Sequence, residues 1–188
     1  MKIIVATAPQ FFIEENTIIQ ALFEEGLDML HISKPESEPI FCERLLTLMT
    51  PKWYDRVVVE DHFYLKEEYG LKGIHLTQRN PTLPSNYKGQ FSRTCTTTEV
   101  PEWIDQCAYV VLDSSPSTLR QAASQIRVNH KVYAGGVTTL DEVQTAQEYG
   151  FGGIVINDVL WSKFDLHESC NYKDLIDLFK KFRKATSN

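Results

Sequence analysis

Two glycines, Gly135 and Gly136, stand directly after a short apolar segment near the end of the chain. A glycine has no Cβ atom, so backbone N–H groups at such a pair can approach a ligand closely. The next apolar segment ends on Asn157 and Asp158. Because backbone N–H groups at the start of a helix hold anions, we predict that these four residues bind a phosphate. Asp158 adds a negative charge there, so either its carboxylate points away or the ligand is less charged.

Side chains that can move protons or hold cations follow the earlier apolar segments. Histidine titrates near neutral pH and serves as a general acid or base, and carboxylates offer the oxygen ligands that Mg²⁺ prefers. The candidate catalytic residues are His31, Lys34, His75, Thr94 and Thr96. The carboxylates at the end of the third apolar segment are Glu60 and Asp61. Together these groups suit a small, anionic, phosphorylated ligand.

Eight short segments rich in β-branched residues must position these groups. Their continuous apolar character is typical of parallel strands that are buried on both faces. The predicted strands are Lys2–Thr7, Asp28–Ile32, Arg56–Glu60, Lys72–Leu76, Phe91–Cys95, Ala108–Leu112, Lys131–Ala134 and Gly153–Asn157. The candidate residues lie at or just past the ends of these strands, where parallel α/β barrels carry their active sites.

Helical patterns fill most of the intervals between the strands. Thr138 or Thr139 can cap a helix over Leu140–Tyr149 that closes at a glycine. The helix near Phe63–Tyr69 must be short, and the next one is in doubt because Asn80–Gly89 holds two prolines and a glycine. We therefore predict one domain over residues 1–188, a compact (β/α)8 TIM barrel with shortened third and fourth helices. A doubly wound open sheet is the alternative, although no glycine-rich fingerprint follows the first strand.

Composition excludes several classes of partner. The chain has 188 residues, of which 43% are hydrophobic, which is enough for a core. The net charge of −6, without a basic stripe, argues against a nucleic-acid partner. No apolar stretch is long enough to span a membrane. The four cysteines have no C-x-x-C spacing and no signal peptide is evident, so we expect a cytoplasmic protein.

Six segments at the strand ends form a series in chain order. They are L-H-I-S-K-P, V-V-V-E-D-H, Y-G-L-K-G-I-H-L-T-Q-R-N, S-R-T-C-T-T-T-E, V-Y-A-G-G-V and G-F-G-G-I-V-I-N-D-V-L-W. In this order they resemble motifs of the thiamine phosphate synthase/TenI family. The resemblance covers nearly the whole chain. It implies a (β/α)8 barrel that binds a thiazole phosphate or thiamine phosphate in thiamine biosynthesis or salvage.

The departures from the family pattern bear on activity. In the resembling family, the synthase joins a pyrimidine diphosphate to a thiazole phosphate, with Mg²⁺ and basic groups stabilising the pyrophosphate that leaves. Asp61 matches the first metal aspartate, so the resemblance implies that it is the metal ligand, helped by Glu60 beside it. The second metal aspartate falls on Asn80, and the strand-two arginine falls on Ser33. The lysine after strand six is absent. The resemblance thus implies a degenerate synthase site, with Mg²⁺ bound only together with a diphosphate and otherwise no cofactor.

Two neighbouring cations differ from the family pattern as well. Arg79 takes the place of an acidic residue, and Lys34 stands one residue out of register with the missing arginine. Adjacent residues of a strand point to opposite faces, so Lys34 can replace that arginine only if the chain turns after the strand.

The sequence leaves open whether the chain is an enzyme. TenI-type tautomerases use a strand-five histidine for proton transfer, and Thr96 falls at that position. A threonine hydroxyl is a poor general base, so His31, which matches a substrate-contacting position, becomes the best proton carrier. The alternatives are a non-catalytic phosphate-ligand-binding relative, and a metal-free thiazole tautomerase or other phosphate-binding barrel isomerase. Any of these can form a homodimer.

Overall fold

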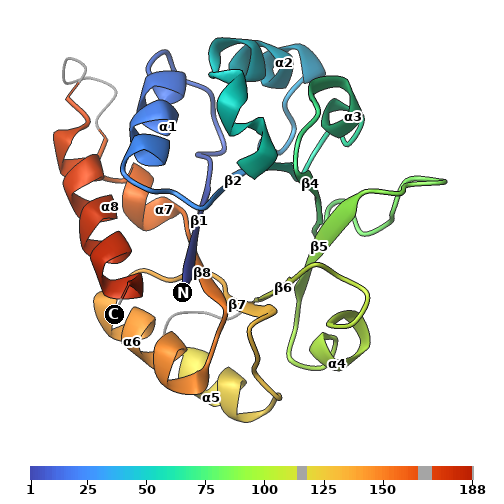
Figure 1. The fold of residues 1–188 in the computed structure, drawn as a ribbon, viewed down its shortest axis with the longest axis vertical. Helices are drawn as coiled ribbons and strands as arrows, with labels where there is room; N and C mark the ends of the chain where they lie inside the picture. The colour runs from blue at the N-terminus through green and yellow to red at the C-terminus, as the bar shows by residue number, and fades with distance from the viewer. Residues whose placement is uncertain (114–117, 165–170, 188) are drawn as a thin grey trace.

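The strands form a closed parallel barrel. The structure, a computed structural model, describes residues 1–113, 118–164 and 171–187. Each strand pairs with the next along the chain, and the last pairs with the first, so that the strands surround the centre in Figure 1. The strands are β1 Lys2–Ala6, β2 Met29–Ile32, β3 Val57–Val59, β4 Gly73–Leu76, β5 Gln90–Cys95, β6 Val110–Leu112, β7 Val132–Ala134 and β8 Gly153–Ile156. The predicted strands and the barrel are confirmed.

The helices lie outside the ring of strands in Figure 1. They are α1 Glu15–Glu24, α2 Pro39–Leu48, α3 Leu65–Tyr69, α4 Val100–Trp103, α5 Leu119–Ser124, α6 Leu140–Tyr149, α7 Asp158–Trp161 and α8 Lys173–Thr186, with a 3₁₀ segment at Pro51–Arg56. The third helix is short, as predicted. The fourth helix, predicted to be shortened, is absent, because none of residues 77–89, between β4 and β5, is helical. The 3₁₀ segment and α7 were not predicted.

Helix α6 shows how local sequence sets an element that borders the barrel mouth. The Thr139 side chain accepts from the backbone N–H of Glu142, and the Glu142 carboxylate accepts from the backbone of Thr139, which is a capping box. The helix ends at Gly150, whose φ of 80° is left-handed and therefore suits glycine. The predicted bounds of this helix are confirmed.

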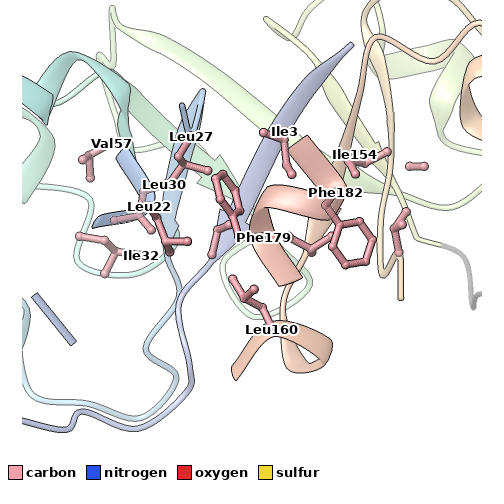
Figure 2. Packing of buried hydrophobic residues seen from close by; sticks show 14 of the residues in the cluster. Ile3, Leu22, Leu27, Leu30, Ile32, Val57, Ile154, Leu160, Phe179 and Phe182 are labelled. Carbon is pink, nitrogen blue, oxygen red and sulfur yellow. The ribbon is translucent and has the colours of Figure 1, made fainter. Parts of the chain in front are cut away.

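Alternate residues of each strand face two different apolar layers. The outward layer packs under the helices: Phe179 and Phe182 of α8 lie against Ile3 of β1 and Ile154 of β8, as Figure 2 shows. The inward layer fills the lower part of the barrel and consists of Ile4, Met29, Tyr109, Val111 and Tyr133, packed against Val155. Closer to the carboxyl ends of the strands, the inward-facing side chains are polar.

No helix among the described residues is both long and apolar enough to cross a membrane.

Candidate functional site at the barrel mouth

A cavity of about 440 Å³ opens at the carboxyl ends of the strands. Six of the predicted site residues line it: Glu60, Thr94, Gly135, Gly136, Asn157 and Asp158. Because parallel strands all end at one rim of the barrel, residues far apart in the sequence meet there. The structure also adds Ser33, Asp113 and Thr138 to the lining. Residues 114–117, where the resembling family carries its strand-six lysine, lie outside the described part of the chain.

His31 and Glu60 form a buried pair at the floor of this mouth. His31 Nδ1 lies 3.0 Å from Glu60 Oε1, and its Nε2 lies 2.6 Å from the Tyr109 hydroxyl. Burial alone would raise the pKa of Glu60, but the hydrogen bond from His31, the nearby His75 and His31 rings and a hydrogen bond from Ser33 together outweigh it and lower that pKa to about 2. An ionised carboxylate only accepts hydrogen bonds, so His31 donates to it from Nδ1. The imidazole is thereby held in one orientation.

His75 lies beside this pair. Its ring centroid is 4.7 Å from that of His31. Its Nδ1 is 2.7 Å from Ser92 Oγ and its Nε2 is 2.8 Å from Thr94 Oγ1. Burial, helped by the neighbouring His31, lowers the pKa of His75 to about 3. The ring is therefore neutral near pH 7, and Thr94 connects it to the cavity.

The Asp61 carboxylate, the candidate metal ligand, is already occupied by protein groups. Arg79 donates from Nη2 to Asp61 Oδ2 at 3.2 Å, and Asn80 donates from Nδ2 to Oδ1 at 2.8 Å. The backbone N–H of Lys34 donates to Oδ2 at 3.1 Å. The same arginine lies 3.8 Å from Glu60 Oε2. A guanidinium and an amide N–H group therefore face the oxygens that a Mg²⁺ ion would need, so these residues do not fit that ion.

Lys34, a candidate catalytic residue, is not part of the cavity lining. Its side chain is fully buried under the β1–α1 connection, where Nζ donates to the carbonyls of Ala8 at 2.8 Å and Gln10 at 3.0 Å. It also forms an ion pair with Glu15, and its Nζ lies 4.2 Å from the centroid of the Phe11 ring. Alternation along the strand turns Lys34 outward, because Ser33 before it faces the mouth. Its ammonium group therefore stabilises the β1–α1 connection and does not line the cavity.

Thr96 also lies apart from the cavity. Its hydroxyl donates to Glu99 Oε2 at 2.8 Å, and its backbone N–H donates to the same oxygen at 2.8 Å. These bonds cap the turn that leads into α4. The side chain is exposed and is not part of the cavity lining.

The predicted phosphate residues meet at one side of the mouth. Gly135 cannot carry a side chain there, since a Cβ would lie 2.7 Å from the carbonyl oxygen of Leu112. The N–H groups of Thr138 and Thr139 already donate to Glu142 Oε2, at 2.7 and 3.0 Å. Among the described residues, the Gly136 amide has no acceptor. The backbone N–H groups of Thr138 and Thr139, at the start of α6, are therefore not available to a ligand, whereas that of Gly136 is.

Asn157 connects this side of the mouth to β1. In the amide orientation that satisfies both of its polar atoms, Nδ2 donates to the carbonyls of Ala6 at 3.2 Å and Thr7 at 3.3 Å. Its neighbour Asp158 is exposed and lines the cavity. Together with Glu60 and Asp113, Asp158 makes the lining acidic.

Two residues of the floor were missed by sequence reasoning. Ser92 and Tyr109 lie two residues before Thr94 and Val111, which line the cavity, and so point to the same interior face. This alternation was the available signal. It could have identified Ser92 and Tyr109 as interior residues, but not as partners of His75 and His31.

Comparisons with known proteins give a family. No family model matches the sequence, and no curated protein matches it. The chain is similar to the crystal structure of thiamine phosphate pyrophosphorylase from Bacteroides thetaiotaomicron, with 44% sequence identity, coverage of 100% of this chain and 98% of that one, and a TM-score of 0.92.

Two further solved structures share the fold. Thiamine phosphate pyrophosphorylase from Pyrococcus furiosus is 15% identical over 99% of this chain and 95% of its own, with a TM-score of 0.72. Tryptophan synthase subunit alpha from Legionella pneumophila is also 15% identical, over 100% of this chain and 93% of its own, with a TM-score of 0.66. At such identity the likeness concerns the fold alone. The 44% identity to the Bacteroides protein over the whole chain is different in kind, and it shows that this chain belongs to the thiamine phosphate pyrophosphorylase (thiamine phosphate synthase) family.

Proposed function

We propose that the barrel mouth binds a thiazole phosphate or thiamine phosphate without a bound Mg²⁺, and that its synthase site is degenerate. The observation that carries this proposal is the Arg79–Asp61 ion pair, with 3.2 Å between Nη2 and Oδ2. The residue that matches the family's metal aspartate is neutralised by a cation of the chain itself. The name of the 44% identical relative supports the class of ligand.

The two sides of the cavity suit the two parts of such a ligand. Gly135 and Gly136 offer backbone without side chains, which supports a phosphate at that side. Glu60 and Thr94, at the other side, offer polar contacts for a heteroaromatic ring. The carboxylates of Asp113 and Asp158 would repel a diphosphate more strongly than a monophosphate, whereas the thiazolium ring of thiamine phosphate carries a positive charge that the Glu60 carboxylate can compensate.

Synthase chemistry is disfavoured by the charges in this mouth. Stabilising the pyrophosphate that leaves requires preorganised positive groups, and losing one such contact costs a factor of about 100 to 1000 in rate. No lysine or arginine is part of the cavity lining among the described residues. Arg79 is near, with Nη2 3.4 Å from Ser33 Oγ, but its charge is engaged by Asp61.

A second candidate function is a metal-free isomerisation of the thiazole tautomerase type. The Glu60–His31 pair favours it, because an oriented imidazole at the floor of a cavity can accept and return a proton. In this alternative the proton carrier is His31 rather than Thr96, since the low pKa of His75 makes that ring a poor base near pH 7. In both functions the phosphate would bind at Gly135 and Gly136.

A binding titration tests the proposal. Purified protein is titrated by calorimetry with thiazole phosphate, thiamine phosphate and the pyrimidine diphosphate, each with and without Mg²⁺. We expect the monophosphates to bind equally well in both conditions and the diphosphate to bind weakly without Mg²⁺. Tight binding of the diphosphate that depends on Mg²⁺, followed by turnover, would show that the chain is an ordinary synthase and would contradict the proposal. Conversion of a thiazole tautomer in the absence of metal would select the isomerase alternative.

A further inference from the structure

We propose that His31, Glu60 and His75 form a binding site for a first-row transition-metal dication of the zinc class. The three side chains come from β2, the end of β3 and β4, and one ligand atom of each lies within 4.8 Å of the others. Exposed fractions of 1%, 8% and 2% place all three at the floor of the mouth. This site is separate from Asp61, whose oxygens are occupied, and does not depend on the proposed ligand.

The ligand set and its spacing fit such an ion. Two histidines and a glutamate are a common set for a zinc ion that keeps a position open, with bonds of about 2.0–2.2 Å. Bonds of that length in a tetrahedron separate the ligand atoms by roughly 3.4 Å. The distance from His31 Nδ1 to Glu60 Oε1 is 3.0 Å, close to that edge. Only His75 needs to approach, by roughly 1.4 Å at most from the 4.8 Å limit.

The second nitrogen of each ring already has the partner that a metal-bound histidine requires. Histidine ligands usually bond through their other nitrogen to an orienting group. Here the Tyr109 hydroxyl lies 2.6 Å from His31 Nε2, and Ser92 Oγ lies 2.7 Å from His75 Nδ1. The atoms left for the metal are His31 Nδ1 and His75 Nε2. Both lie on the mouth side, because their present partners, Glu60 and Thr94, line the cavity.

The groups around the three ligands are compatible with an ion. An ion on His31 Nδ1 leaves the ring proton on Nε2, which then donates to the Tyr109 oxygen. Among the described residues, Arg79 is a cation that opposes a dication, with Nη2 3.8 Å from Glu60 Oε2, but its side chain is 44% exposed and paired with Asp61. The cavity supplies the open fourth position for water or a ligand oxygen.

The donor set distinguishes this site from a magnesium site. Mg²⁺ is a hard ion that prefers oxygen ligands in octahedral geometry, whereas imidazole suits Zn²⁺, Co²⁺ and Ni²⁺. Two nitrogens and one carboxylate therefore select against Mg²⁺. An ion here would lie beneath a bound ligand and polarise one of its oxygens or a water.

The test uses the whole protein and metal alone. Chelator-treated protein is titrated with Zn²⁺ by calorimetry and with Co²⁺ by visible absorption. We expect one equivalent to bind, with a Co²⁺ spectrum typical of nitrogen ligation, and a large excess of Mg²⁺ should not displace it. Absence of a stoichiometric site, or displacement by Mg²⁺, would overturn the proposal. Thiazole-phosphate binding by metal-free protein is measured separately, so failure of one proposal does not carry over to the other.

Variants locate the ion. His75→Gln and Glu60→Gln should weaken Zn²⁺ binding more than Tyr109→Phe, which keeps all three ligands and should weaken it about 10- to 100-fold. His130→Gln is the matched control, because His130 is exposed and outside the cluster. Unchanged affinity in both ligand variants would contradict the site. Circular dichroism checks folding; if the ligand variants do not fold, the imidazole NMR signals of His31 and His75 in intact protein decide, and signals unmoved by Zn²⁺ would also overturn it.

Discussion

The guanidinium of Arg79 lies 3.2 Å from the carboxylate of Asp61. Asp61 matches the aspartate with which the resembling synthases hold Mg²⁺, and Arg79 stands where they carry an acidic residue. Asn80 completes the exchange, since its amide N–H group points at the same carboxylate, with 2.8 Å between Nδ2 and Oδ1. In the function we propose, this internal ion pair takes the place of a metal centre at one side of the mouth.

Removal of the guanidinium should make Asp61 available to Mg²⁺. In Arg79→Ala we expect the affinity for Mg²⁺ to rise roughly fivefold, because a half-exposed ion pair contributes about 1 kcal/mol. The measurement is a calorimetric Mg²⁺ titration. Arg120→Ala is the control, since it removes an exposed arginine that pairs with Glu148 at 3.3 Å, outside the mouth. Equal Mg²⁺ affinity in the Arg79 variant and the unmodified protein would contradict our account of Asp61.

Substitution of Gly136 should weaken binding of thiazole phosphate. Gly136 lines the cavity with φ 64°, a left-handed conformation that a side chain strains, so we expect an added methyl group to disturb the backbone that the ligand approaches. Gly70→Ala is a matched control, because Gly70 has φ 65° and its added Cβ would have no neighbour within 4 Å. Both variants should lose about the same stability in thermal unfolding, but only Gly136→Ala should lose affinity by calorimetry. Undiminished binding by folded Gly136→Ala would remove this side of the mouth as the phosphate site.

The unmodified chain should make little thiamine phosphate from the two synthase substrates. The resembling family's strand-two arginine is Ser33 here, and a loss of even one preorganised charge costs about 100- to 1000-fold in rate. The measurement is the thiamine phosphate formed in the presence of Mg²⁺. Ser33→Arg combined with Asn80→Asp should raise the rate, whereas Ser33→Arg alone should raise it less. Robust turnover by the unmodified protein would refute the degenerate site.

Lys34 should matter for stability and not for binding. Lys34→Met leaves the Glu15 carboxylate buried without its counter-ion, which typically costs about 3–5 kcal/mol. The double variant Glu15→Gln/Lys34→Met should recover most of that loss in urea unfolding. Both proteins, where folded, should bind thiazole phosphate as the unmodified chain does. Weakened binding by the folded double variant would place Lys34 in the site after all.

The loss of unfolding free energy caused by Lys34→Met should also depend on pH. Burial raises the pKa of Glu15 from 4.5 to about 7, even though Lys34 opposes that rise. A carboxyl group whose pKa is higher in the folded state stabilises the fold below its unfolded pKa, and this contribution is lost as pH rises through the folded value. Without the lysine the folded pKa rises further. Lys34→Met should therefore be closer to the unmodified protein at pH 5 than at pH 8, and an equal difference at both would contradict the buried pair.

The sequence by itself determined the frame of this protein. Each predicted strand is present because a run of β-branched residues such as Val57–Val59 is stable only when buried on both faces. The bounds of α6 follow from a threonine cap and a terminal glycine, which act within one turn of the helix. The position of the mouth also follows, because parallel strands in a barrel all end at one rim.

Only the tertiary structure decided which groups meet. His31 and Tyr109 are 78 residues apart, and their hydrogen bond exists because the barrel closes with both side chains on its inner face. Glu15 meets Lys34 because the β1–α1 connection folds over the end of β2. Arg79 reaches Asp61 from a connection without a helix, whose path no local pattern predicts. Local sequence sets an element and the face that a residue occupies, whereas partners across the barrel depend on how all eight strands close together.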